Sequence, residues 1–209
     1  MPEFSSRDPQ SPGFWDERFD QGFTPWDRGG VPQALRDFVA GSDRPLRTLI
    51  PGCGAAYELV YLCESGWDAR AIDFSPAAVA LAREQAGQWA DRVQQADFFD
   101  WHGTAALDLI YERAFLCALP PSLWVPVAQR WSQLLAPGMR LAGFFFFDDS
   151  AKGPPFGISR ERLDALLRDD FVCIEDAPVA DSIAVFSGKE RWMVWQRIQT
   201  GVMSRPDPG

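Results

Sequence analysis

The stretch RTLIPGCGAAYELVYLCESGWDARAIDFSP, residues 47–76, decides the fold of this 209-residue chain. An apolar run leads into a turn with Gly52 and Gly54, a helical pattern follows, and a second apolar run ends at Asp73. Glycines directly after a strand let the backbone turn sharply and approach a ligand closely, and the next helix offers free N–H groups. The stretch therefore predicts a strand, a ligand-binding loop, a helix and a second parallel strand.

Short β-like runs alternate with helical patterns along the rest of the chain. The runs that precede a helical or loop segment are 47–50, 68–73, 92–97, 107–112 and 139–147. Two later apolar runs, FVCIEDAPV (171–179) and AVFSGKERWMVWQRI (184–198), are typical of a closing antiparallel pair. We expect an α/β fold of Rossmann-like type, with a seven-stranded, mostly parallel sheet, one antiparallel strand and helices on both faces.

Helix boundaries are marked at several places. The helical segment 55–65 follows the glycine loop, and Ser75 with Pro76 forms an N-cap before AAVALAREQA. The segment 122–138 is helical with a stop at Pro137-Gly138, and Ser159 caps a later helix.

Length and composition favour one globular domain, which we place at 14–199. The proline-rich and polar ends, 1–13 and 200–209, are expected to be flexible. No apolar run approaches membrane-spanning length and no signal-peptide pattern opens the chain, so we expect a cytoplasmic protein that binds no membrane. We also expect a monomer.

Charge and metal-ligand content narrow the function. A net charge of −9 argues against nucleic acid as a substrate, since phosphate backbones are repelled. The cysteines lie far apart and the single histidine, His102, stands in a loop-like stretch, so we predict no metal site and no disulfide framework. The cysteines are expected to be reduced and to pack in the core.

The residues after the glycines distinguish two ligands. Asp73 ends the second strand, where an acid can accept hydrogen bonds from both ribose hydroxyls. A dinucleotide loop needs a third glycine where this chain has Tyr57, and Glu58 in the first helical turn suits a sulfonium and an ammonium better than two phosphates. S-adenosylmethionine is favoured. Asp97-Phe98 after the third strand suits the adenine, although a capping aspartate and a core phenylalanine would look identical.

Together with three further stretches, these residues resemble the thiopurine S-methyltransferase family and its thiol and halide methyltransferases. The stretches are FWDERFDQGFTPWDRGGVP (14–32), similar to the family's W-x3-[WF]…G-x-TPW-D signature, YERAFLCALPP (111–121), similar to its [DE]-R-[GA]-x-L segment, and GPPFGIS (153–159), which matches its GPPF loop. Tyr111, Ala114 and Phe115 depart from the usual pattern, which puts the shape of the substrate in doubt.

The resemblance implies a class I methyltransferase that uses S-adenosylmethionine and forms S-adenosylhomocysteine, with residues 14–45 as a helical lid. It assigns substrate contacts to Trp26, Arg113 and Phe156, with Arg113 facing the nucleophile as the catalytic residue. The cofactor-binding residues that we predict are Trp15, Phe19, Pro51, Gly52, Cys53, Gly54, Glu58, Asp73, Phe74, Ser75, Asp97 and Phe98.

Methyl transfer from a sulfonium to a thiolate destroys two opposite charges, so a dry aromatic site favours it and no strong general base is needed. We predict transfer to a small soft nucleophile: a thiopurine-like thiol, sulfide, a selenium or tellurium species, or a halide. Three alternatives remain open: N-methylation of a small heterocycle, an NAD-dependent oxidoreductase, and a non-catalytic binding module. For Arg113 the alternative is an ion pair with Glu112 or Asp108, and Trp101, Trp131 and Trp195 are assigned to the core.

Overall fold

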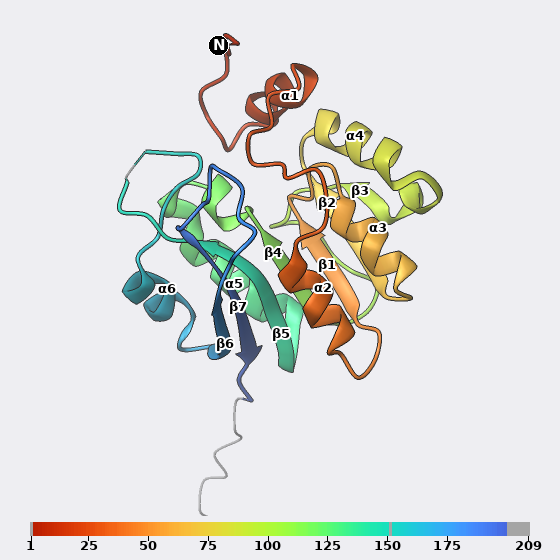
Figure 1. Ribbon diagram of the computed structural model, residues 1–209, viewed down its shortest axis with the longest axis vertical. Helices are drawn as coiled ribbons and strands as arrows, with labels where there is room; N and C mark the ends of the chain where they lie inside the picture. Colours follow the sequence, from red (N-terminus) through yellow and green to blue (C-terminus); the bar gives the residue numbers. More distant parts are fainter. Residues whose placement is uncertain (1, 151, 200–209) are drawn as a thin grey trace, which may run out of the picture.

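A single sheet with the strand order β3-β2-β1-β4-β5-β7-β6 forms the centre of the computed structural model (Figure 1), which describes residues 2–150 and 152–199. Strand β7 is antiparallel to β5 and β6, and the other pairings are parallel. The predicted seven-stranded sheet with one antiparallel strand is confirmed. The predicted flexible segment 200–209 lies outside the described residues.

The elements follow the alternation that the sequence predicts. The helices are α1 (Pro12–Asp20), α2 (Gln33–Ala40), α3 (Tyr57–Glu64), α4 (Pro76–Ala86), α5 (Trp124–Leu134) and α6 (Arg160–Leu167), with short 3-10 turns at Gly87–Arg92, Leu116–Ala118 and Pro121–Leu123. The strands are β1 (Arg47–Pro51), β2 (Asp68–Asp73), β3 (Val93–Gln95), β4 (Leu107–Arg113), β5 (Leu135–Phe146), β6 (Phe171–Pro178) and β7 (Glu190–Arg197).

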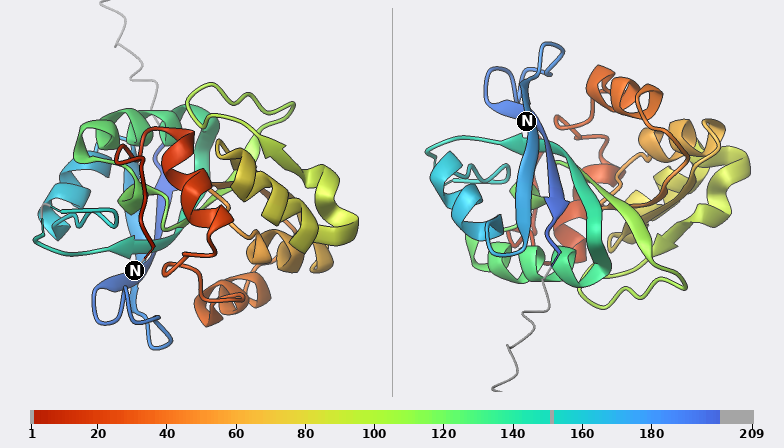
Figure 2. Two further views of the ribbon diagram at one scale, coloured as in Figure 1. Left: turned by 90° about the horizontal axis from the view of Figure 1, so that it is seen from above. Right: turned by 90° about the horizontal axis from the view of Figure 1, so that it is seen from below.

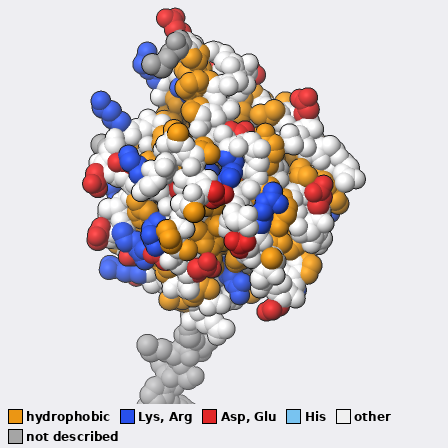
Figure 3. Space-filling model, in the orientation of Figure 1, with side chains coloured by type: hydrophobic (Ala, Val, Ile, Leu, Met, Phe, Trp, Pro, Cys, Tyr) orange, Lys and Arg blue, Asp and Glu red, His pale blue; other side chains and the backbone are white. Residues whose placement is uncertain are grey.

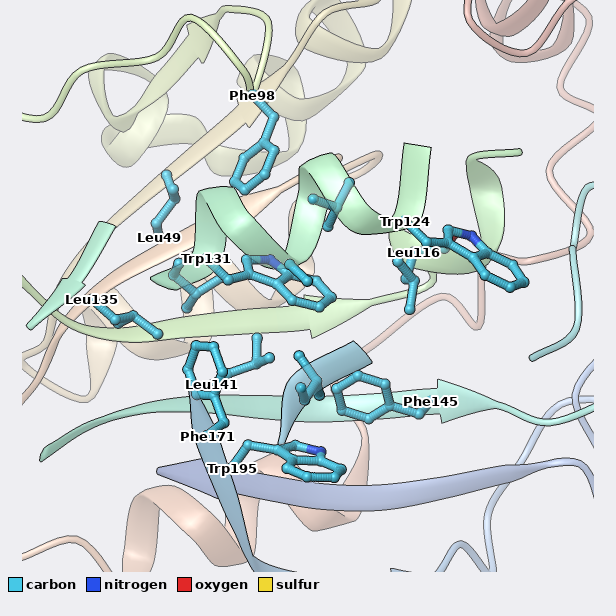
Figure 4. Packing of buried hydrophobic residues seen from close by; sticks show 14 of the residues in the cluster. Leu49, Phe98, Leu116, Trp124, Trp131, Leu135, Leu141, Phe145, Phe171 and Trp195 are labelled. Atoms are coloured by element: carbon cyan, nitrogen blue, oxygen red, sulfur yellow. The ribbon is translucent and has the colours of Figure 1, made fainter. Parts of the chain in front are cut away.

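Each face of the sheet is covered by its own hydrophobic cluster. Because side chains alternate along a strand, Leu49 of β1 packs into the cluster of α5 and α6, while its neighbour Ile50 packs into that of α2, α3 and α4. In the first cluster the ring of Trp131 on α5 lies 6.4 Å from that of Phe145 on β5 (Figure 4). Trp101, Trp131 and Trp195 are all buried, as predicted.

Side-chain caps fix where two helices begin. The Ser75 hydroxyl oxygen accepts a hydrogen bond from the Ala78 amide at 3.1 Å before α4, and Ser159 accepts one from the Arg162 amide at 3.2 Å before α6. Both caps confirm the predicted helix starts.

Several predicted boundaries are wrong: β3 covers only Val93–Gln95 of the predicted 92–97, and β5 begins at Leu135 instead of 139. Three further errors have a clear cause in the structure. Helix α5 ends at Leu134 rather than at Pro137-Gly138, because Leu135 is buried and already pairs with Leu107. The ladder then shifts register between Leu107 and Leu109, and this irregularity accommodates Pro137, which has no N–H to donate.

The other two errors concern a strand and a helix start. Residues 184–189 form turns and β7 begins only at Glu190, since Phe186 accepts a turn hydrogen bond from Lys189 and packs on Phe146 instead of joining the sheet. Helix α3 begins at Tyr57, two residues later than predicted, because Ala56 has a left-handed conformation (φ 57°).

The surface carries both signs of charge. Acidic and basic side chains are interspersed over the face seen in Figure 3. No helix among residues 2–150 and 152–199 is both long and apolar enough to cross a membrane.

Candidate active site

A cavity of about 1170 Å³ opens at the carboxyl ends of β1, β2 and β4, beneath α1. Its volume exceeds the roughly 300–1,000 Å³ of a typical small-molecule pocket, so it has room for a cofactor and an acceptor together. The predicted site residues that line it are Trp15, Phe19, Trp26, Gly52, Cys53, Gly54, Glu58, Asp73, Phe74, Asp97, Phe98 and Arg113.

Three predicted site residues are not in the cavity wall. Pro51 is buried at the end of β1, and Ser75 is fully buried at the start of α4. Phe156 lines a separate, much smaller cavity behind the wall, whereas its neighbours Pro154 and Pro155 reach the main one.

The glycine loop needs its glycines. Gly52 and Gly54 have φ values of 58° and 50°, in the left-handed region that favours glycine. A Cβ on Gly52 would lie 2.7 Å from the ring of Phe115, and one on Gly54 would contact Phe19 at 3.7 Å. The backbone therefore passes close beneath the cavity.

Asp73 is placed to receive hydroxyl groups. Its carboxylate accepts hydrogen bonds from the amides of Ser75 at 3.0 Å and Gly54 at 3.3 Å, and a carboxylate has about four lone-pair sites. Burial, with a smaller contribution from Asp16, raises the pKa of Asp73 to about 6 despite these hydrogen bonds. A buried carboxylate with spare acceptor capacity fits the two ribose hydroxyls of S-adenosylmethionine.

Helix α1 covers the cavity and is held by contacts of Trp15 and Asp16. The Trp15 indole N–H donates to the Pro9 carbonyl at 2.8 Å, and the Trp15 ring meets that of Trp26 edge-on at 5.4 Å. On its other side the Asp16 carboxylate accepts hydrogen bonds from the Ser75 hydroxyl and from the Ala77 amide. The views from the side and from above both show α1 lying next to α4 (Figures 1 and 2).

Asp97 and Phe98, which the sequence predicts to bind the adenine, both line the cavity. The Asp97 carboxylate accepts a hydrogen bond from the Phe99 amide at 2.8 Å, as a capping aspartate would. Phe98 is a member of the core cluster and lies 5.0 Å from the ring of Phe115, yet both residues also line the cavity. Asp97 therefore caps the backbone and Phe98 packs in the core, and both residues also contribute to the cavity wall.

Arg113 also lies in the cavity wall, with a largely buried side chain. Its Nη1 donates to Glu190 Oε2 at 2.7 Å, and its guanidinium lies 4.5 Å from the ring centre of Phe144 and 5.4 Å from that of Phe186. The acid that pairs with Arg113 is therefore Glu190 on β7, and neither Glu112 nor Asp108 as considered from the sequence.

Those two acids have other partners because of their strand positions. Asp108 points to the opposite end of β4, where it binds Arg44 at 2.7 Å. Glu112 is fully buried, and its Oε1 accepts hydrogen bonds from the amides of Phe115 and Leu116. Burial raises the pKa of Glu112 to about 7.

Four residues in or next to the cavity wall are not among the predicted site residues. Phe186 lines the cavity but belongs to an apolar run that the sequence predicts to be a strand, and Phe115, also in the wall, departs from the family pattern. Glu190, the partner of Arg113, and Asp16, the partner of Ser75, carry no signal in the sequence, since each partner is 77 or 59 positions away.

Comparison with known proteins identifies a family and individual relatives of this chain. Residues 10–198 match the sequence profile of the family described as Thiopurine S-methyltransferase (TPMT). The chain is 31% identical to thiocyanate methyltransferase 1 of Brassica oleracea over 196 residues, which are 89% of this chain and 85% of that protein. It is 30% identical to probable thiol methyltransferase 2 of Arabidopsis thaliana over 163 residues, 75% of this chain and 72% of that protein.

The fold has counterparts among solved structures. The Burkholderia thailandensis 1,6-didemethyltoxoflavin-N1-methyltransferase, solved with bound 1,6-didemethyltoxoflavin and S-adenosylhomocysteine, superposes with a TM-score of 0.73 over 95% of this chain and 94% of that one, at 19% identity. The glycine loop, the buried acid that ends β2 and the family match over nearly the whole chain agree, and this chain belongs to the thiopurine S-methyltransferase family.

Proposed function

We propose that the protein transfers a methyl group from S-adenosylmethionine to the sulfur of a small thiol, or to a similar soft nucleophile such as sulfide, a selenium species or a halide. The match of residues 10–198 to the family carries this conclusion. It also leaves no support for the dinucleotide alternative, which lacked its third glycine at Tyr57.

S-adenosylmethionine supplies an electrophilic methyl carbon next to a positively charged sulfur. On the side of the protein, Asp73 would accept the ribose hydroxyls and the loop 51–54 would pack against the methionine part. Glu58 is buried in the wall and burial raises its pKa, so a cation beside it would stabilise its charged form. These roles rest on the positions of the side chains around one cavity.

The acceptor end would be kept dry by aromatic side chains. Trp26 contacts the rings of Trp15 and Phe19 on one side, and Phe186 lines the same cavity near Arg113. Water-poor surroundings favour the step because charge disappears as the new S–C bond forms. We propose that residues 14–45, which include α1, act as the lid that excludes solvent.

Arg113 would bind the acceptor sulfur. A guanidinium has five N–H donors, and only one is given to Glu190 by the hydrogen bonds of the described residues. The remaining donors can hold a thiolate and lower the pKa of the bound thiol. Alignment of the sulfur with the methyl carbon then provides most of the acceleration.

Location and assembly are further proposals. All four cysteines are free, which fits a reducing compartment such as the cytoplasm. Large exposed apolar side chains in the described part of the chain are few: Leu81, Val125, Val172 and Ile174. A monomer accords with this pattern, and light scattering at several concentrations tests it.

The proposed function is tested with an acceptor panel. The protein is incubated with S-adenosylmethionine and a thiol, a thiopurine, sulfide, selenide, iodide or a heterocyclic amine, and the products are identified by mass spectrometry. S-methylated product from at least one thiol is expected. Methylation of the heterocycle alone would favour the N-methyltransferase alternative, and no product with any acceptor, despite S-adenosylhomocysteine binding, would favour a non-catalytic module.

A further inference from the structure

Arg18 on α1 lies in the cavity wall with its guanidinium between two aromatic rings. The guanidinium carbon is 3.3 Å from the ring centre of Phe14 and 4.2 Å from that of Phe4. Its Nη1 donates a hydrogen bond to the Phe14 carbonyl at 2.6 Å, and within the described residues the other N–H donors of the guanidinium have no acceptor. The side chain is therefore held in place with donors left for a ligand.

The segment before α1 supplies Phe4, which also lines the cavity. The ring of Phe4 lies 5.4 Å from that of Phe23. The next residue along the chain, Ser5, donates from its amide to the Glu17 carboxylate at 2.8 Å. Because these contacts fix Phe4 over the guanidinium, Arg18 belongs to a built part of the wall.

The positive charge of Arg18 has no acid paired with it. Among residues 2–150 and 152–199 it forms no ion pair, whereas Arg28 and Arg113 in the same wall are paired with acids at 2.8 Å and 2.7 Å. Burial lowers the pKa of Arg18, and the attraction of Glu17 opposes this shift only in part. A half-buried cation that is surrounded by rings gains from an anionic partner, and the cavity is where such a partner can enter.

The other charges near this part of the wall do not cancel that of Arg18. Arg7, in the same segment as Phe4, lines the cavity and is exposed, so it adds positive charge. Asp27 accepts a hydrogen bond from the Gly29 amide at 2.7 Å and acts on Tyr57 and Glu58 at the other helix of the wall, α3. The wall therefore offers a ligand a cation at α1.

We propose that Arg18 is a specificity-determining residue, which binds a carboxylate carried by the methyl acceptor, so that the preferred acceptors are thiols with a carboxylate remote from the sulfur. This assignment rests on the proposed methyl transfer and narrows its acceptor class. Arg113 at the end of β4 holds the sulfur, and Arg18 on α1 holds the carboxylate at another part of the same wall. A guanidinium fits a carboxylate with two parallel hydrogen bonds.

The position of Arg18 on its helix favours the acceptor over the cofactor as the source of this carboxylate. Its neighbour Phe19 faces the glycine loop, since a Cβ on Gly54 would lie 3.7 Å from the Phe19 ring. Successive residues of a helix point about 100° apart, and Arg18 packs against Phe4 and Phe14 instead. The methionine carboxylate of a cofactor on the glycine loop is therefore not the expected partner of Arg18.

The test compares carboxylate-bearing thiols with their own amides, which have the same shape and no charge. The values of kcat/KM are measured for 3-mercaptopropionate, 4-(mercaptomethyl)benzoate and the two corresponding amides. In at least one pair the wild type is expected to prefer the acid by at least about tenfold, the effect of one charge-assisted hydrogen bond. Arg18→Gln keeps a polar side chain but removes the charge, so it should lower this ratio of acid to amide by about tenfold.

Arg36→Gln is the matched control. Arg36 is exposed on α2, lies over the Tyr61 ring at 5.0 Å and does not line the cavity, so this variant removes the same charge and a similar ring contact elsewhere. Its ratio of acid to amide should stay within about twofold of the wild type, because an exposed charge outside the cavity is screened. A merely structural role of Arg18 would lower kcat/KM for acid and amide alike, and an unchanged ratio in Arg18→Gln would overturn the assignment.

Two further measurements separate the possible failures. Calorimetry should find S-adenosylhomocysteine binding to Arg18→Gln within about threefold of the wild type, and a loss of tenfold or more would assign Arg18 to the cofactor carboxylate and overturn the proposal. If Arg18→Gln does not fold, the wild type decides, since equal or lower activity on both acids than on their amides would overturn the assignment while methyl transfer stands. Absence of methylation of every thiol would instead overturn the proposed function, and this assignment with it.

Discussion

The carboxylate of Asp16 on α1 accepts a hydrogen bond from the hydroxyl of Ser75, the residue that precedes α4, at 2.5 Å. The same oxygen accepts from the Ala77 amide at 3.1 Å. Helix α1, which covers the cavity, is thereby attached to the N-terminus of α4, where a negative charge is favourable. Ser75 lies only two residues after Asp73.

Asp16→Ala should release α1 from α4. We expect a loss of about 1 kcal/mol in the free energy of unfolding, the usual value for a lost capping group, and about fivefold weaker binding of S-adenosylhomocysteine. Urea denaturation and calorimetry measure the two effects. Asp16→Asn keeps the acceptor oxygen and should bind within about twofold of the wild type, so equal binding by all three proteins would disprove the role of this contact.

Gly52→Ala should damage the cofactor end of the cavity. The left-handed conformation costs a non-glycine residue about 1–2 kcal/mol, and the added Cβ would also meet the Phe115 ring at 2.7 Å. Gly22→Ala is the matched control, since Gly22 has φ 63° with no atom within 4 Å of the added carbon. We expect calorimetry to show S-adenosylhomocysteine binding at least tenfold weaker in Gly52→Ala and unchanged in Gly22→Ala; similar affinities in both would contradict the close approach of this loop to the cofactor.

Arg113→Ala should lower kcat/KM for a thiol by at least about tenfold while S-adenosylhomocysteine binding stays within about threefold. The variant also leaves Glu190 buried without its partner, which is destabilising. The double variant Arg113→Ala/Glu190→Gln should recover stability in thermal unfolding but not thiol methylation. Undiminished methylation in Arg113→Ala would show that the assigned role is wrong.

Glu112 should make the protein less stable as the pH rises. Burial raises its pKa from 4.5 to about 7, so between these values the folded state binds more protons than the unfolded state. The free energy of unfolding should therefore fall through this window. Arg113 and Glu190 act on the same carboxyl group, the arginine favouring its charged form and the glutamate opposing it.

Glu112→Gln tests this linkage. The amide is neutral throughout, so the variant should gain about 1–3 kcal/mol relative to the wild type between pH 5 and pH 8 in urea denaturation. Asp73 titrates in both proteins and cancels from the difference. A stability difference that does not vary with pH would contradict the assignment.

The sequence predicted the parts of the fold that depend on local patterns. Ser75-Pro76 and Ser159 define helix starts through contacts three residues away, and the apolar run of β1 is buried because the strand is central. The helix end predicted at Pro137-Gly138 is wrong because a strand distant in sequence, β4, pairs with Leu135, so that the helix ends at Leu134. Patterns in sequence carry no information about such a partner.

The candidate site divides in the same way. Gly52, Gly54 and Asp73 were found because strand, loop and acid follow one another within one crossover. Glu190 and Arg113 are 77 positions apart and meet only because β7 pairs with β5 beside β4. Phe186 lines the cavity from a turn, residues 184–189, whose apolar sequence pattern cannot be told from that of a strand.

Transfer of a labelled methyl group tests the central claim most directly. The protein is incubated with benzyl mercaptan and S-adenosylmethionine carrying a trideuterated methyl group, and both products are quantified by mass spectrometry. We predict the S-methyl thioether with all three deuterons, in amounts equal to the S-adenosylhomocysteine formed and reduced by Arg113→Ala. S-adenosylhomocysteine binding without any labelled thioether, from this or any other thiol, would contradict the account.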